Sequence, residues 1–225
     1  VLDRLPGNEE MKKQLQKSIS SGNLSHAYVI QGAAGSGKDI LAQIMSMAFL
    51  CTGEPKPCGV CKNCRKIDRH VHPDVKVITA QEGKDQITVD VIRALRADAY
   101  VMANEAEGKV YLIEDAQNMN VAAQNALLNI LEEPPAGVRF LLLATTLEAF
   151  LPTILSRTAK LTLGPVSAKR QRQRLQEKCP QADSDQIERA MAFSGGNTEM
   201  SEALLAESGS GGMEEITDEF IAKLC

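Results

Sequence analysis

Residues 28–39, Tyr-Val-Ile-Gln-Gly-Ala-Ala-Gly-Ser-Gly-Lys-Asp, decide the fold of this chain. The apolar run Tyr28–Ile30 is followed by a glycine-rich loop and then by a segment with helical spacing of apolar residues. Glycines let consecutive backbone N–H groups converge on a phosphate at a helix N-terminus, and a lysine neutralises phosphate charge. The pattern favours a phosphate-binding loop over a glycine-rich turn with an exposed lysine. Its candidate contacts are Gly32, Gly35, Gly37 and Lys38.

The position after the lysine departs from this pattern. A hydrolytic loop places Ser or Thr there to ligate Mg²⁺, whereas this chain has the carboxylate of Asp39. A later apolar run ends in Glu114-Asp115, although hydrolytic P-loop proteins present Asp first and Glu second. The reversal displaces both charges by about one methylene, and misplacement on the scale of ~1 Å can cost ~10²-fold in rate. We expect a degenerate acidic pair, with two solvated carboxylates as the alternative.

Thr145 and Thr146 follow another apolar run. Thr145 is a candidate polar sensor of a bound nucleotide. The alternative is that both threonines cap the segment that follows.

Short apolar runs alternate with longer helical patterns, which is typical of an α/β layer fold. Because the runs are mostly apolar throughout, we expect strands covered on both faces in a parallel sheet. Helical spacing relates Leu41, Met45 and Ala48, and a second such segment ends before Pro134-Pro135. The five predicted strands are 28–30, 75–78, 110–113, 140–143 and 160–163.

The strand pattern stops after Gly164-Pro165, and helical stretches take over. We therefore expect an α/β domain over residues 1–164 and a small helical domain over 165–225. An apolar stripe of Ile216, Phe220 and Leu224 predicts a last helix that needs a neighbour to cover it.

Four cysteines, Cys51, Cys58, Cys61 and Cys64, lie in one short loop before the second predicted strand. Zinc takes four thiolates in a tetrahedron, and a site closed by four cysteines leaves no position for water. The spacing favours a structural zinc site over disulfides or free thiols. Cys179 and Cys225 are expected to be isolated thiols.

Composition limits the function classes. The chain has 25 basic and 29 acidic residues among 225, so it lacks the positive surplus of an autonomous nucleic-acid binder. It shows no secretory signal pattern and no apolar run of roughly 18 residues, and we expect a cytoplasmic location. One basic run is a candidate for phosphate contacts, although a solvated helix face is the alternative: Lys169, Arg170, Arg172, Arg174 and Lys178.

Several motifs together resemble the bacterial DNA polymerase III clamp-loader family of AAA+ proteins over essentially the whole chain. They are Ser25-His26-Ala27-Tyr28, the four-cysteine insertion at 51–64, the Leu127–Pro135 helix end, Ala144-Thr145-Thr146 and Ile154-Leu155-Ser156-Arg157. The resemblance implies a P-loop AAA+ domain followed by a helical lid. Family members continue into a third, collar-forming helical domain, which we do not expect in this chain. Without that collar we expect a largely monomeric fragment.

Within the family, motor subunits of the gamma/tau type hydrolyse ATP, whereas a stator subunit has a damaged site. Asp39, the reversed acidic pair and Gly196-Asn197-Thr198-Glu199, which lacks the arginine of motor subunits, favour the stator. The segments around His72-Pro73-Asp74 and Val91-Ile92-Arg93 also resemble the stator. The enzyme alternative is an active motor, and a third is a zinc-bearing P-loop regulator outside replication.

The resemblance also implies a role for Arg157 as an arginine finger that acts in the nucleotide site of a neighbouring motor subunit. From the residues alone, a surface arginine or one paired with a nearby carboxylate is favoured over a finger, and only the family pattern reverses this preference. The family places Cys after this arginine, where this chain has Thr158. The implied partners are the motor (gamma/tau) and delta subunits and, through the complex, the sliding clamp and primer-template DNA.

Overall fold

The computed structural model describes residues 1–5, 7–81, 83–164, 167–194 and 197–207, except for the side chains of Arg170, Thr198 and Glu199. These residues form two compact units. The first comprises Val1–Gly32 and Gly37–Leu163, and the second comprises the loop segment Ala33–Ser36 together with the chain from Gly164 onward.

The first unit is built on a five-stranded sheet whose strand order is β2-β3-β4-β1-β5. Every neighbouring pair is parallel, which confirms the predicted fold class. The predicted strands lie within one or two residues of the observed ones. The three central strands are apolar runs buried between layers, whereas the two edge strands are partly exposed. The strands are β1 (Ala27–Gln31), β2 (Val75–Ile78), β3 (Lys109–Ile113), β4 (Val138–Ala144) and β5 (Ala159–Thr162).

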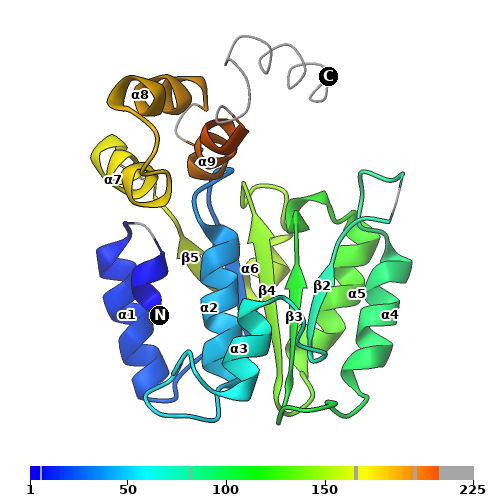
Figure 1. Cartoon of the computed structure of the whole chain (residues 1–225). Helices are drawn as coiled ribbons and strands as arrows, with labels where there is room; N and C mark the ends of the chain where they lie inside the picture. Colours follow the sequence, from blue (N-terminus) through cyan, green and yellow to red (C-terminus); the bar gives the residue numbers. More distant parts are fainter. Residues whose placement is uncertain (6, 82, 165–166, 195–196, 208–225) are drawn as a thin grey trace. The chain divides into compact units, whose positions relative to one another are not determined.

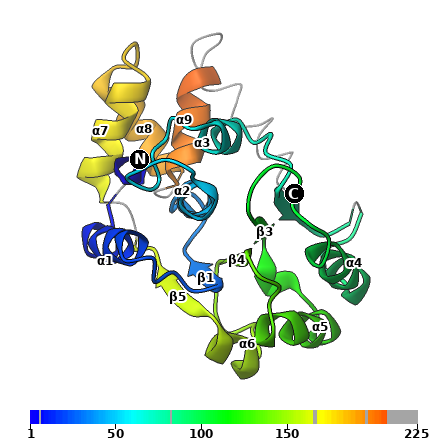
Figure 2. The same ribbon diagram turned by 90° about the horizontal axis from the view of Figure 1, so that it is seen from below.

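Helices cover both faces of this sheet (Figures 1 and 2). One face carries α1 (Glu9–Ser20), α2 (Lys38–Leu50) and α3 (Lys62–Asp68), and the other carries α4 (Val89–Ala99), α5 (Val121–Glu132) and α6 (Pro152–Arg157). Alternate residues of β1 belong to the two hydrophobic cores on opposite faces of the sheet. Tyr28 and Ile30 pack with α2, whereas Ala27 and Val29 pack with α5. Short 3-10 helices occupy Leu2–Arg4 and Ala116–Asn118.

Two helices of the first unit depend on features other than apolar periodicity. In α1 only Lys12, Leu15 and Ile19 are buried, so the apolar stripe is narrow. In α3 the thiol sulfur of Cys61 caps the N-terminus by accepting the backbone N–H of Cys64. The sequence patterns predicted neither helix.

The second unit packs three helices around Leu175, Ile187 and Leu204. They are α7 (Ala168–Lys178), α8 (Ser184–Phe193) and α9 (Thr198–Glu207). Asp183 and Gln186 form a reciprocal capping box that fixes the start of α8. The apolar stripe at Ile216, Phe220 and Leu224 lies outside the described residues. Among the helices that the structure describes, every one is too short or too polar to cross a bilayer.

Candidate functional site

The glycine-rich loop connects β1 to α2, as its sequence predicts. The backbone N–H of Gly32 donates to Ala144 of β4 at 3.0 Å, which anchors the start of the loop to the sheet. Gly37, with φ of 89°, is the N-cap of α2. The ammonium of Lys38 donates to the carbonyl of Gly32 at 2.8 Å. The lysine therefore closes over its own loop, at the N-terminus of a helix.

Gly35 and Ser36 belong to the loop segment of the second unit. Gly35 has φ of 68°, and a Cβ built on it would lie 2.0 Å from the side-chain oxygen of Asn197, so only glycine fits there. The hydroxyl of Ser36 is buried and has no hydrogen-bond partner among the described residues. The glycine-dependent turn matches what a phosphate-binding loop requires, and the Ser36 hydroxyl is a polar group that a ligand could satisfy.

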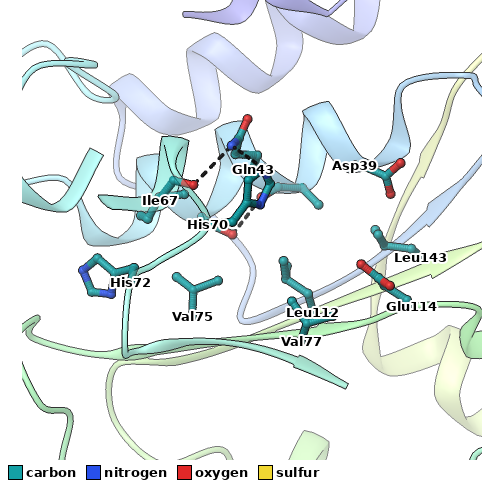
Figure 3. Close-up of a pocket in the computed structure, with 12 residues that line it drawn as sticks. Asp39, Gln43, Ile67, His70, His72, Val75, Val77, Leu112, Glu114 and Leu143 are labelled. Carbon is teal, nitrogen blue, oxygen red and sulfur yellow. Dashed lines mark hydrogen bonds between the residues drawn. The ribbon is translucent and has the colours of Figure 1, made fainter. Parts of the chain in front are cut away.

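The acidic end of the site differs from that of a hydrolytic enzyme. Asp39 and Glu114 line one cavity of about 80 Å³, together with Gln43 and His70 (Figure 3). Burial raises the pKa of Glu114, and the neighbouring carboxylates of Asp39 and Asp115 raise it further. The carboxylates thus concentrate negative charge in this cavity, and Asp39 occupies the position at which a hydrolytic loop has the Ser or Thr that ligates the nucleotide-bound metal.

Asp115 is not among the residues that line this cavity. It adopts a left-handed backbone, with φ of 45°, and caps the 3-10 helix at Ala116–Asn118. Gln117 donates to its carboxylate at 3.1 Å and accepts the backbone N–H of Thr145 at 3.2 Å. Gln117 therefore connects the acidic pair to the candidate sensor. No local sequence pattern could reveal this link, because it joins the ends of two strands.

The four cysteines of the 51–64 loop converge. Their sulfur atoms all lie within 4.8 Å of one another, and among the described residues they form the one group of this kind that could hold a metal ion. Backbone N–H groups point at these sulfurs: Cys58 and Gly53 donate to Cys51, and Cys61 donates to Cys58. Burial opposes the thiolate, but hydrogen bonds led by the N–H of Cys64 lower the pKa of Cys61 to about 5. The donor set fits a metal that prefers four thiolates.

Charged residues connect the cysteine loop to the segment that precedes β3. Lys62 and Lys66 of α3 form ion pairs with Glu105 at 3.0 and 2.6 Å. Asp74, which is fully buried, accepts the backbone N–H groups of Asn104, Glu105 and Ala106. Burial opposes its charge, but these N–H donors keep the pKa of Asp74 below its usual value. The cysteine loop therefore rests on a fixed segment before β3.

Arg157 lies at the C-terminal end of α6 and keeps 36% of its side chain exposed. Its guanidinium pairs with Glu132 at 2.6 Å and donates to the carbonyl of Thr153 at 3.1 Å. The hydroxyl of Thr158 caps α6 by donating to Ile154 at 3.0 Å. Thr158 therefore supports the end of the helix, and its presence in place of a cysteine leaves Arg157 on the surface.

The basic run on α7 is largely neutralised within the second unit. Arg172 pairs with Glu188, and both Arg174 and Lys178 pair with Glu202. Lys169 is exposed, and the side chain of Arg170 is not described. These pairs favour the solvated-face interpretation over phosphate contacts.

The chain matches known proteins over most of its length. The family model described as "DNA polymerase III, delta subunit" matches residues 7–167. The delta-prime subunit of Pseudomonas aeruginosa is 35% identical over 77% of this chain and 53% of its own, and that of Bacillus subtilis is 34% identical over 73% and 50%. The tau subunit of Salmonella typhimurium is 35% identical over 76% of this chain and 26% of its own. This chain thus spans about half the length of its curated delta-prime relatives.

A solved structure supports the fold. A DNA polymerase III gamma subunit-related protein of Thermotoga maritima superposes with a TM-score of 0.60 at 20% identity, covering 92% of this chain and 60% of that one. This similarity supports the P-loop AAA+ architecture. Since the family model covers well over half of the sequence, this chain belongs to the DNA polymerase III delta-subunit family, together with the delta-prime subunits that it resembles.

Proposed function

We propose that this chain acts as the delta-prime subunit of a DNA polymerase III clamp loader, a stator that does not hydrolyse ATP itself. The observation that carries the proposal is that Glu114 lines the same cavity as Asp39, the residue that directly follows the loop lysine. In a hydrolytic site, a hydroxyl and an Asp hold Mg²⁺ there. Two carboxylates at these positions repel nucleotide phosphates and leave the metal without its usual ligands.

The reversed acidic pair adds to this effect. Glu114 lines the cavity, whereas Asp115 is held by Gln117 outside it. A hydrolytic site needs a carboxylate to orient the attacking water, in addition to the one on the metal. With Asp115 hydrogen-bonded to Gln117 outside the cavity, the second residue of the pair does not stand beside Glu114 as a hydrolytic site requires, and this arrangement supports a chain that does not hydrolyse Mg-ATP.

Catalysis is instead supplied in trans by Arg157. A guanidinium delivered from a neighbouring subunit stabilises charge that develops on the transferred phosphoryl group. Arg157 suits this role because it is partly exposed at a helix end and its planar guanidinium presents several donors in a rigid fork. The neighbours in this proposal are the motor (gamma/tau) and delta subunits, and through them the sliding clamp and primer-template DNA. Residues 1–164 act as the AAA+ domain and residues 165–225 as its lid.

The four cysteines hold a structural zinc ion in this proposal. Cys51, Cys58, Cys61 and Cys64 provide all four ligands, so the ion would have no open position for water or substrate. Its contribution is to close the 51–64 loop and to set the start of α3, where Cys61 is the N-cap.

Metal content tests the zinc assignment. We expect the purified chain to carry about one zinc ion, because four converging thiolates satisfy its tetrahedral preference. Cys61→Ser should reduce the amount of bound zinc to close to zero. The matched control, Cys179→Ser, replaces a buried thiol in the second unit and should leave it unchanged. The measurement is elemental analysis by mass spectrometry, and zinc retained in Cys61→Ser would contradict the four-cysteine site.

Nucleotide turnover by the isolated chain tests the stator proposal. We expect no Mg-dependent ATP hydrolysis above background, and the same background for Lys38→Ala. An active motor instead predicts turnover that Lys38→Ala abolishes. Phosphate release with a coupled assay distinguishes the two, and Lys38-dependent turnover would refute the stator.

A further inference from the structure

The ion pair between Arg157 and Glu132 joins two motifs that lie apart in the sequence. Glu132 is the last residue of α5 and Arg157 is the last residue of α6. The pair is 2.6 Å long, and the two side chains are 36% and 48% exposed. Thr153 and Ser156 accept from the other terminal nitrogen of the guanidinium at 3.1 and 3.4 Å. Both ends of the guanidinium fork are therefore held within one chain.

The end of α5 is itself fixed to the sheet. The ring Nε2 of His26 donates to the carbonyl of Leu131 at 3.0 Å. His26 directly precedes β1, and the backbone N–H of Ser25 beside it donates to the hydroxyl of Tyr28 at 2.9 Å. The Ser-His-Ala-Tyr segment thus secures the residue next to Glu132. This gives the carboxylate a fixed position relative to the sheet.

A held guanidinium still has donors for a phosphate. Arginine carries N–H groups on all three nitrogens, and the contacts to Glu132, Thr153 and Ser156 engage only the two terminal ones. An unrestrained arginine loses rotamer entropy when it is fixed in one geometry. A partner that fixes it beforehand lowers this cost at the moment of reaction.

From these contacts we propose that Glu132 is a positioning residue for Arg157. Its carboxylate holds the guanidinium in the orientation that the neighbouring subunit's nucleotide site requires. The inference rests on the proposed arginine-finger function and deepens it. Glu132 does not touch the reacting atoms. It acts through Arg157, and His26 supports it through the end of α5.

The test is a double-mutant cycle in a clamp loader whose motor subunits carry alanine in place of their own corresponding arginines, so that ATP hydrolysis reports only the site that faces this chain. Glu132→Gln should lower kcat about two- to five-fold with KM for ATP unchanged, the range expected when a half-exposed ion pair is lost. In an Arg157→Ala background, Glu132→Gln should have no further effect. The matched control is Glu133→Gln, which makes the same charge change one residue along, where the side chain has no ion pair among the described residues.

The outcomes separate the inference from the function on which it rests. If Arg157→Ala lowers turnover and Glu132→Gln does not, or raises it, the positioning role is wrong and the finger stands. If Glu132→Gln lowers turnover equally in the Arg157→Ala background, its effect is on folding rather than on Arg157, which also overturns the inference. If Arg157→Ala itself has no effect, the finger assignment fails.

Discussion

Replacing Arg157 by alanine should lower ATP hydrolysis about 10³-fold at the one nucleotide site that faces this chain. In the proposed trans role the guanidinium stabilises charge on the phosphoryl group in the transition state, and trans arginines contribute 10³ or more in other phosphoryl-transfer systems. Because the lost interaction exists only in the transition state, kcat should fall while nucleotide affinity changes little.

The measurement needs a complex in which the other nucleotide sites do not hydrolyse ATP. Motor subunits whose own corresponding arginines are replaced by alanine leave only the site that faces this chain active, and single-turnover hydrolysis then reports on it. Arg157→Lys keeps the charge but not the planar fork, and it should recover little of the rate. Arg93→Ala is the control, since Arg93 is exposed on α4 in an i,i+3 pair with Asp90. Unchanged hydrolysis in Arg157→Ala would refute the trans role.

Asp98→Asn should destabilise the first unit by about 3 kcal/mol. The carboxylate of Asp98 accepts from Lys76 at 2.7 Å, Lys109 at 3.3 Å and Tyr111 at 2.5 Å. Lys109 is only 2% exposed, so its ammonium would remain buried beside a neutral amide. Removing one partner of a buried charge pair costs about 3–5 kcal/mol, and the lower end applies because Asp98 is itself 29% exposed.

Equilibrium urea unfolding followed by tyrosine fluorescence measures this loss. The chain has no tryptophan, and its three tyrosines, Tyr28, Tyr100 and Tyr111, all lie in the first unit. Asp90→Asn is the control on the same helix; its pair with Arg93 is exposed, and we expect a change below about 0.5 kcal/mol. Equal free energies of unfolding for the two variants would show that the Asp98 network contributes nothing.

The same network predicts that the free energy of unfolding depends on pH in the acidic range. Burial opposes the charge of Asp98, but hydrogen bonds from Lys76, Tyr111 and Lys109 lower its pKa from 3.8 to about 2. Since the folded state binds the proton more weakly than the unfolded state, the contribution is fully present above pH 4. It is lost as the pH falls towards 2. Asp98→Asn should therefore flatten the stability curve in that interval.

The sheet could be predicted because its central strands β1, β3 and β4 are almost fully buried between the two helical layers. Each strand is a short apolar run bounded by turn residues, and such runs predict a parallel sheet without reference to other segments. The loop from Gly32 to Lys38 and the four cysteines were recognised in the same way, because their geometry follows from local spacing. The cysteine sulfurs do converge, as that spacing predicts.

Tertiary contacts were not predictable in this way. Gln117 joins Asp115 to Thr145 only because β3 and β4 are neighbours in the sheet. The pairing of Arg157 with Glu132 likewise depends on the packing of α6 against α5. From the sequence, a nearby carboxylate was one interpretation of Arg157, but nothing in the spacing singled out Glu132.

The central claim is that this chain contributes Arg157, and no catalytic nucleotide site of its own, to a clamp loader. The most direct test compares ATP hydrolysis by complexes reconstituted with the unaltered chain, with Lys38→Ala and with Arg157→Ala. Lys38→Ala should hydrolyse ATP at the rate of the unaltered complex, whereas Arg157→Ala should lose turnover at the site it faces. Lost turnover in Lys38→Ala, with normal turnover in Arg157→Ala, would contradict the account and identify this chain as a motor.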